Sequence, residues 1–413
     1  MASTLLTNIK VLAGVGTENI LLRGADLKRL SSIEDAYLLM EDGIIAGYGS
    51  MEDLDSPESY AGNIINASDQ LVLPAWCDSH THLVFAASRE EEFVDRIRGA
   101  SYAEIAAKGG GILNSAAKLA DASEMELLRS AWGRLQEIMQ QGTGAVEIKS
   151  GYGLSIESEL KMLRVIRRLK DTSPIPVKST FLGAHTFPLS YKEDHETYIR
   201  QIIEDMLPVI AQEGLADYID VFCETGFFSP REMGRICEAG KRVGLRPKLH
   251  VNQLNSIGGI EEAIRLDALS ADHLETMTSA DISLLANSPV IGTLLPSAAF
   301  FLRMDYQPAR ALIDAGAALA LASDFNPGSS PSGNMNFILS LACIQLRLLP
   351  EEAINAATIN GAFAMGLEEE VGSIQVGKRA NLLLTRPIPS LAYLPYAFGS
   401  SLIDKVFING EPV

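Results

Sequence analysis

The sequence predicts an α/β fold in which a (β/α)8 TIM-like barrel carries a small composite β-sandwich domain formed from both chain ends. Three observations lead to this prediction. The chain has 413 residues, which is room for a barrel of about 250 residues and one further small domain. Its middle alternates short β-branched runs with amphipathic helical stretches. Both ends instead have the pattern of short strands separated by turns.

The first 70 residues contain short apolar stretches broken by turns. Asp42-Gly43 lies between two apolar runs, which predicts a β-hairpin. Residues 371–413 again have short apolar runs with Gly and Asn-Gly turns. We therefore expect 1–70 and 371–413 to form one composite β domain and 71–370 to form the barrel.

Eight runs in the middle of the chain have the composition of strands, and eight is the number that closes the barrel. Most of these runs end on polar residues. Because catalytic groups of barrel enzymes collect at the carboxyl ends of the strands, the polar endings predict an active site there. The runs are LVLPAWCDSHTH, AVEIKSGY, VKSTFLGAH, YIDVFCE, PKLHVNQ, LSADHL, VIGTLLP and LALASD.

The formal net charge of −18 repels nucleic-acid backbones and anionic lipid headgroups, so neither is an expected partner. An anionic substrate would need a specific cation in the pocket. The four cysteines are scattered and form no CxxC pair, as in a reducing cytoplasm. We find neither a secretory leader nor an apolar run of membrane-spanning length, so we expect a cytoplasmic protein.

His80 and His82 end the first run, and their spacing places both side chains on one side of the strand, with Thr81 on the other. A buried structural role is the alternative, but two of only six histidines at this spacing favour a metal site. His250 and Asp324 end the fifth and eighth runs and can complete the site. Three imidazoles and one carboxylate suit Zn(II) or Fe(II), with a position left for water.

A divalent metal lowers the pKa of bound water to near neutrality, so hydrolysis needs no serine or cysteine nucleophile. Asp324 is the predicted general base, which later returns the proton to the leaving nitrogen. His273 ends the sixth run and is predicted to stabilise the developing oxyanion. It could instead join the metal ligands or be a buried structural histidine.

With HTH after the first strand, single histidines after the fifth and sixth, and SD after the eighth, the chain resembles the amidohydrolase superfamily. Within it the chain is similar to the imidazolonepropionase family of histidine degradation over nearly its whole length. HTH and SD are shared across the superfamily, whereas Arg89, the Gly triplet and SGYGL are specific to that family. The motifs are HTHLVFAASREEEF, YAEIAAKGGGI, EIKSGYGL, FLGAH, LHVNQ, SADHL and SDFNPGSSP.

The resemblance implies a mononuclear site, because binuclear members often carry a carbamylated lysine at the end of strand four, where this sequence has Glu224. It implies that His80, His82, His250 and Asp324 hold one zinc or iron ion. The implied reaction opens the ring amide of 4-imidazolone-5-propanoate to give N-formimino-L-glutamate. A homodimer is the family-level expectation and the commonest symmetric state.

The resemblance also places seven residues around the substrate. Arg89 can form a bidentate pair with the propanoate, which answers the problem of an anionic substrate; a surface salt bridge with the adjacent glutamates is the alternative. Tyr152 and His185 can hydrogen-bond the carboxylate or the ring, although Tyr152 could simply cap the barrel mouth. The seven residues are Arg89, Tyr152, His185, Gln253, Asn326, Gly328 and Ser329.

Gln253 stands three residues after His250, where many amidohydrolases have a glutamate that shuttles protons. An amide is neither acid nor base at neutral pH, so we expect Gln253 to bind ring nitrogens and leave proton transfer to Asp324 and His273. The runner-up function, deamination of an aromatic ring, would prefer the glutamate. A non-catalytic barrel would typically have lost the metal ligands.

Two loops have more than one interpretation. The loop NPGSSPSGN follows Asp324, and its N–H groups and hydroxyls could bind the substrate or merely form a turn. Gly109-Gly110-Gly111 lacks the spacing of a phosphate loop. We expect these glycines to belong to a mobile lid over the pocket.

Overall fold

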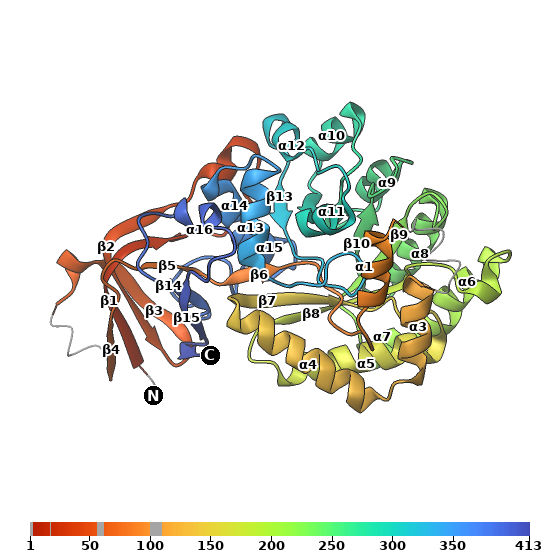
Figure 1. Ribbon diagram of the computed structural model, residues 1–413, viewed down its shortest axis with the longest axis horizontal. Helices are drawn as coiled ribbons and strands as arrows, with labels where there is room; N and C mark the ends of the chain where they lie inside the picture. Colours follow the sequence, from red (N-terminus) through yellow and green to blue (C-terminus); the bar gives the residue numbers. More distant parts are fainter. Residues whose placement is uncertain (1–2, 17, 56–61, 100–109) are drawn as a thin grey trace.

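The structure is a computed structural model that describes residues 3–16, 18–55, 62–99 and 110–413. The described residues form two eight-stranded sheets. Figure 1 shows the two sheets next to each other, with helices around one of them and both chain ends on the side of the other. The prediction of a barrel joined to a domain built from both chain ends is confirmed.

The barrel sheet consists of parallel neighbours in chain order. Its two edge strands meet just beyond their ends: Thr81 bridges Phe325, and the N–H of Asp324 donates to the carbonyl of His80 over 3.0 Å. This closure places the HTH and SD segments side by side. The barrel strands are β6 (Trp76–Asp78), β7 (Thr143–Lys149), β8 (Val177–Ala184), β9 (Tyr218–Cys223), β10 (Arg246–Val251), β11 (Ser270–His273), β12 (Ile291–Leu294) and β13 (Leu319–Leu321).

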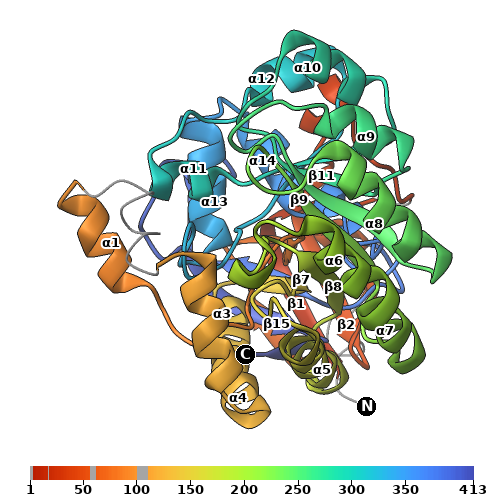
Figure 2. The same cartoon turned by 90° about the vertical axis from the view of Figure 1, so that its right-hand side faces the viewer.

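Amphipathic helices surround the strands of the barrel (Figure 2). The α4 helix shows the pattern: it begins with a capping box between Ser123 and Glu126 and buries Leu127, Leu135 and Ile138. None of the described helices is long and apolar enough to cross a membrane. The α-helices are α1 (Glu90–Ile97), α3 (Ile112–Asp121), α4 (Glu124–Gln140), α5 (Ile156–Thr172), α6 (His195–Arg200), α7 (Leu207–Glu213), α8 (Pro230–Arg242), α9 (Gly259–Arg265), α10 (Ser279–Ala286), α11 (Pro296–Leu302), α12 (Ala309–Ala315), α13 (Met335–Ile344), α14 (Pro350–Ala357), α15 (Ile359–Phe363) and α16 (Tyr393–Tyr396).

The second sheet combines strands from both ends of the chain in the order β16-β15-β14-β5-β1-β2-β3, with β4 paired to β1. The hairpin predicted at Asp42-Gly43 joins β2 to β3, and both turn residues have positive φ. The sheet curls until Ile45 donates to the carbonyl of Lys378 over 2.9 Å. The sandwich is therefore one curled sheet around a shared apolar core. Its strands are β1 (Ser3–Ala13), β2 (Ser32–Glu41), β3 (Ile44–Ser50), β4 (Asn63–Asn66), β5 (Leu71–Pro74), β14 (Leu382–Thr385), β15 (Ile403–Ile408) and β16 (Glu411–Pro412).

The sequence predicts that the run LVLPAWCDSHTH is one strand. In the structure this run contains two strands, which belong to different sheets. The N–H of Ala75 donates to Asn381 beside the composite sheet, and the next N–H, of Trp76, donates to Gly142 beside the barrel, both over 2.9 Å. The chain thus changes sheets directly after Pro74. Both strands are buried throughout, so the sequence pattern does not reveal the point at which the chain leaves one sheet for the other. The limits 1–70, 71–370 and 371–413 stay a prediction.

Candidate metal centre and active site

Three histidines and one aspartate meet at the carboxyl end of the barrel strands. The ring centroid of His80 lies 5.4 Å from that of His82 and 4.4 Å from that of His250. Oδ1 of Asp324 lies 3.5 Å from Nε2 of His80 and 3.7 Å from Nε2 of His82. All four side chains are buried. As the spacing predicts, Thr81 points away from the cluster, and its hydroxyl donates to the carbonyl of Glu147 over 2.6 Å.

Two overlapping groups of donor atoms, which share His80, are each compact enough to hold an ion. Among the described residues, the donor atoms of His80, His82 and His250 lie within 4.8 Å of one another, as do those of His80, His273 and Asp324. Nε2 of His80 is buried without a hydrogen-bond partner, which is costly unless a ligand engages it. Burial lowers the pKa of His80, His82 and His250 well below the usual value, so their rings are neutral at pH 7. Neutral imidazoles beside a carboxylate fit a divalent metal.

Two aspartates orient the histidines. Nδ1 of His80 donates to Oδ2 of Asp272, and Nδ1 of His250 donates to Oδ2 of Asp220, both over 2.7 Å. With Nδ1 engaged, the Nε2 lone pair of each ring remains for a metal. Sequence reasoning missed both aspartates. The signal for Asp220 was a charged residue inside the buried strand YIDVFC, and Asp272 stands directly before His273.

The loop after β13 holds Asp324 in a left-handed conformation (φ 54°). Its carboxylate Oδ2 accepts from the hydroxyl of Ser329 over 3.0 Å. The Asn326 amide donates to the Asp324 carbonyl over 2.7 Å, and its oxygen accepts from the N–H groups of Gly328 and Ser329. Burial raises the pKa of Asp324 to about 6, against the opposing effect of His273. The predicted substrate loop thus contacts the predicted base.

His273 lies beside the other histidines, with its ring centroid 5.6 Å from that of His80 and 5.1 Å from that of His250. Nδ1 lies 3.5 Å from Glu275 Oε1, which also accepts from the amide of Gln307 over 3.0 Å. Burial disfavours the protonated ring, but the carboxylates of Glu275, Asp324 and Asp272 together outweigh it, and the pKa of His273 is raised. His273 is therefore prepared to donate a hydrogen bond. Sequence reasoning missed Glu275 and Gln307, which no local pattern connects.

The ring of Tyr152 lies next to both Arg89 and the histidine cluster. The guanidinium carbon of Arg89 lies 5.8 Å from the Tyr152 ring, and Nε of Arg89 donates to Ser115 over 2.9 Å. The Tyr152 ring lies 5.7 Å from that of His82 and 5.4 Å from that of His185, which stacks on His82. Among the described residues, Arg89 forms no ion pair with a carboxylate. The alternative of a surface salt bridge with the adjacent glutamates therefore gains no support.

A buried carboxylate shapes the SGYGL segment. Glu159, in α5, accepts hydrogen bonds from the N–H groups of Gly151, Gly153 and Leu154 over 2.6 to 3.2 Å. These three bonds fold the chain around Tyr152. Sequence reasoning missed Glu159, although a carboxylate among the apolar positions of a helix is a signal.

The remaining predicted residues lie in loops at the same end of the barrel. Gln253 is partly buried in the loop after β10. Glu224 holds this loop by accepting from the N–H groups of Leu254 and Asn255 over 2.7 and 3.1 Å. Glu224, which stands where binuclear amidohydrolases often have a carbamylated lysine, thus positions the chain next to Gln253.

The predicted lid falls partly on residues that are not described. Gly109 lies outside the described residues, and Gly111 precedes α3, where its N–H donates to the carboxylate of Glu92 over 2.9 Å. The lid therefore stays a prediction.

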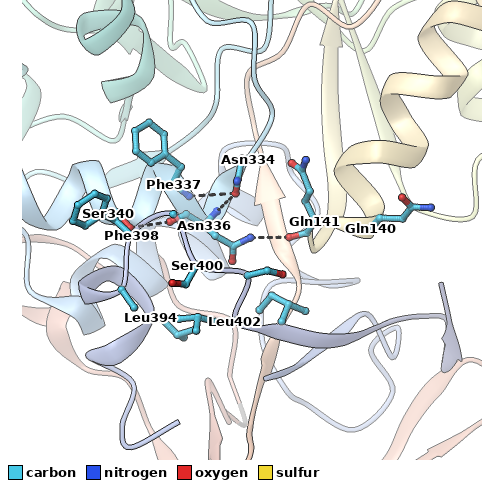
Figure 3. Close-up of a pocket in the computed structure, with 14 residues that line it drawn as sticks. Gln140, Gln141, Asn334, Asn336, Phe337, Ser340, Leu394, Phe398, Ser400 and Leu402 are labelled. Carbon is cyan, nitrogen blue, oxygen red and sulfur yellow. Dashed lines mark hydrogen bonds between the residues drawn. The ribbon is translucent and has the colours of Figure 1, made fainter. Parts of the chain in front are cut away.

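A cavity of about 350 Å³ lies apart from the histidines, between the end of α4, α13 and the α16 region (Figure 3). Amide and hydroxyl groups line it together with Phe337 and Phe398. Across it, the Asn336 amide donates to the carbonyl of Gln141 over 2.9 Å. Its lining has no charged residue, histidine or cysteine, and so provides neither a strong metal ligand nor a general base.

Comparison with known proteins agrees with this geometry. The amidohydrolase family matches residues 71–413. An imidazolonepropionase of Flavobacterium johnsoniae is 57% identical over 409 residues, which cover 99% of each chain. An imidazolonepropionase of Clostridium tetani is 44% identical and covers 94% of this chain and 93% of its own length.

Solved structures share the fold at much lower identity. E. coli guanine deaminase aligns with a TM-score of 0.73 at 14% identity, covering 100% of this chain and 99% of its own. An adenosine deaminase of Xanthomonas campestris with bound zinc aligns with a TM-score of 0.68 at 17% identity, covering 100% and 92%. By its family match and its full-length relatives, the chain belongs to the amidohydrolase family and, within it, to the imidazolonepropionase family.

Proposed function

We propose that this chain hydrolyses the ring amide of 4-imidazolone-5-propanoate to N-formimino-L-glutamate. The observation that carries the proposal is the pairing of a histidine–aspartate cluster with one arginine across Tyr152. The cluster suits hydrolysis by an activated water, and the guanidinium of Arg89 suits a carboxylate tail. The full-length relatives named imidazolonepropionase support the same assignment.

His80, His82, His250 and Asp324 would hold one divalent metal ion, zinc or iron. When bound there, the ion would supply Lewis acidity and lower the pKa of a water molecule towards neutrality. Asp220 and Asp272 keep the Nε2 atoms of His250 and His80 directed into the cluster.

Proton transfer falls to Asp324. Its carboxylate would accept a proton from the attacking water and return it to the ring nitrogen that leaves when the amide bond breaks. Hydrogen bonds from the Ser329 hydroxyl and within the Asn326 turn keep the carboxylate oriented.

His273 would donate a hydrogen bond to the carbonyl oxygen as negative charge develops on it. Glu275 favours the protonated ring, and Gln307 holds Glu275. This assignment leaves the neutral amide of Gln253 for the ring nitrogens, since it cannot replace a proton-shuttling glutamate.

Substrate binding would begin at Arg89, whose guanidinium can engage both oxygens of the propanoate. Tyr152 and His185 would hydrogen-bond the carboxylate or the ring. Asn326, Gly328 and Ser329 would border the ring from the loop after β13. The homodimer and the cytoplasmic location stay predictions from the sequence and the family.

The test is direct. The ultraviolet absorbance of freshly prepared 4-imidazolone-5-propanoate should fall when metal-loaded protein is added, and product should accumulate in equal amount. A protein inactivated by Asp324→Asn is the matched control for spontaneous ring opening. No fall with fully metallated protein, together with turnover of a purine, would overturn the proposal in favour of a deaminase.

A further inference from the structure

Lys149, the last residue of β7, is fully buried beneath the histidine cluster. Its Nζ lies 2.9 Å from Oδ2 of Asp220 and 3.5 Å from Oδ2 of Asp272. These are the same two oxygens that accept hydrogen bonds from Nδ1 of His250 and Nδ1 of His80. One ammonium group therefore contacts both oxygens that orient these two histidines.

The lysine belongs to a buried network of five charges. Nζ of Lys149 lies 2.8 Å from Oε1 of Glu147, whose Oε2 lies 3.0 Å from Nζ of Lys248. The two lysines, Glu147, Asp220 and Asp272 make up the five charges, and all of these side chains are buried. Replacing buried ions by apolar residues of similar size is often neutral or stabilising, so stability alone does not account for this network.

The network also joins strands that carry no ligand to strands that do. Asp220 lies on β9 and Asp272 on β11, the two neighbours of β10, which carries His250. The carboxylate that accepts from Nδ1 sets the plane of each imidazole. A shift of either carboxylate would therefore rotate a ring and move its Nε2.

We propose that Lys149 is a positioning residue that locks the Asp220–His250 and Asp272–His80 pairs to each other and so sets the distance and angle between the two imidazoles. The inference rests on the proposed role of these histidines as metal ligands. It extends that role to a residue that touches neither metal nor substrate. A lysine suits this position, because its ammonium has several donors on a flexible stem and can contact carboxylates from two strands at once.

The experiment measures metal binding directly, with Co²⁺ as the probe. Full-length Lys149→Met and wild-type protein are stripped of metal, and the affinity for Co²⁺ is measured by competition with a chromogenic chelator. We expect Lys149→Met to bind Co²⁺ about 10- to 100-fold more weakly, the usual effect of losing an outer partner of a metal ligand. We also expect the visible absorption of the Co²⁺ protein to shift, because this spectrum reports the geometry of the ligands.

Glu147→Gln is the matched control. It removes a charge from the same buried network and weakens one contact of Lys149, but the contacts of Lys149 with Asp220 and Asp272 remain. We expect it to change the Co²⁺ affinity by no more than about threefold and to leave the spectrum unchanged. Equal losses in both variants would overturn the proposal, because general damage to the network would then explain them.

Thermal unfolding of the metal-free proteins separates folding from positioning. Should Lys149→Met not fold, Lys149→Gln carries the same measurement, since its shorter and uncharged side chain cannot contact both carboxylates as the ammonium does. A folded variant that binds Co²⁺ within about twofold of the wild type, with the same spectrum, would overturn the inference. Wild-type protein that binds Co²⁺ but does not hydrolyse the imidazolone when loaded with Zn²⁺ or Fe²⁺ would count against the proposed function and leave this test intact.

Discussion

Gly328 lies against the guanidinium of Arg89. A Cβ atom at position 328 would stand 2.4 Å from Nη1 of Arg89, which is too close for both groups to keep their places, so the end of the arginine side chain would have to shift. Arg96 adds a second contact by donating to the Gly328 carbonyl over 2.9 Å. The loop that orients Asp324 and the arginine proposed to bind the substrate carboxylate are therefore in direct contact.

Gly328→Ala should displace the guanidinium and weaken substrate binding. We expect KM to rise about 10-fold with a smaller change in kcat, because the carboxylate is held alike in the ground and transition states. Steady-state kinetics measure both values. Gly133→Ala is the control: its Cβ would meet no atom within 4 Å, so KM should not change. An unchanged KM in Gly328→Ala would argue against the close packing of these residues.

Arg89→Ala should have the larger effect of the same kind. Loss of a charge-assisted pair predicts a rise in KM of about 10- to 100-fold, with kcat changed much less. Arg89→Lys should recover only part of the loss, because an ammonium cannot form the bidentate pair. A fall in kcat at constant KM would contradict the role of Arg89 as an anchor for the carboxylate.

Asp324→Asn should abolish proton transfer while keeping the shape of the side chain. We expect kcat to fall by a factor of about 100 to 10,000, the usual contribution of a general base. Metal content, measured by elemental analysis, should be determined on the same preparation, since Asp324 is also a proposed ligand. Activity near the wild-type level with metal bound would assign the base to another residue.

Glu159→Ala should destabilise the protein, because it leaves the buried N–H groups of Gly151, Gly153 and Leu154 without their acceptor. At about 1 kcal/mol or more for each unsatisfied group, the free energy of unfolding should fall by roughly 3 kcal/mol. Urea denaturation measures the loss. Glu157 is exposed in the same helix turn. The control Glu157→Ala should lower the free energy of unfolding by less than about 0.5 kcal/mol.

Removal of metal by a chelator should abolish hydrolysis and lower the melting temperature. A metal at 100 times its dissociation constant contributes about 2.7 kcal/mol to the stability of the folded state. Calorimetry with and without added Zn²⁺ or Fe²⁺ tests this, and elemental analysis of protein purified without added metal identifies the native ion. Full activity in demonstrably metal-free protein would refute a metal-dependent mechanism.

Local patterns were enough to predict the alternation of strands and helices in the barrel, the hairpin at Asp42-Gly43 and the shared side of His80 and His82. These features depend on residues that are near in sequence, through the period of a strand or the chemistry of a turn. The polar strand endings predicted that the histidines and Asp324 would gather at one end of the barrel, because its parallel strands all end at the same rim.

Contacts between segments that are distant in sequence could be found only in the folded structure. The partners of Lys149, the three bonds to Glu159 and the change of sheets after Pro74 each join segments that no sequence period relates. Barrel closure and the register of neighbouring strands decide which buried carboxylate reaches which histidine. The HTH spacing could therefore predict a metal site, but only the packing of β7, β9 and β11 reveals the lysine and aspartates that hold its imidazoles in place.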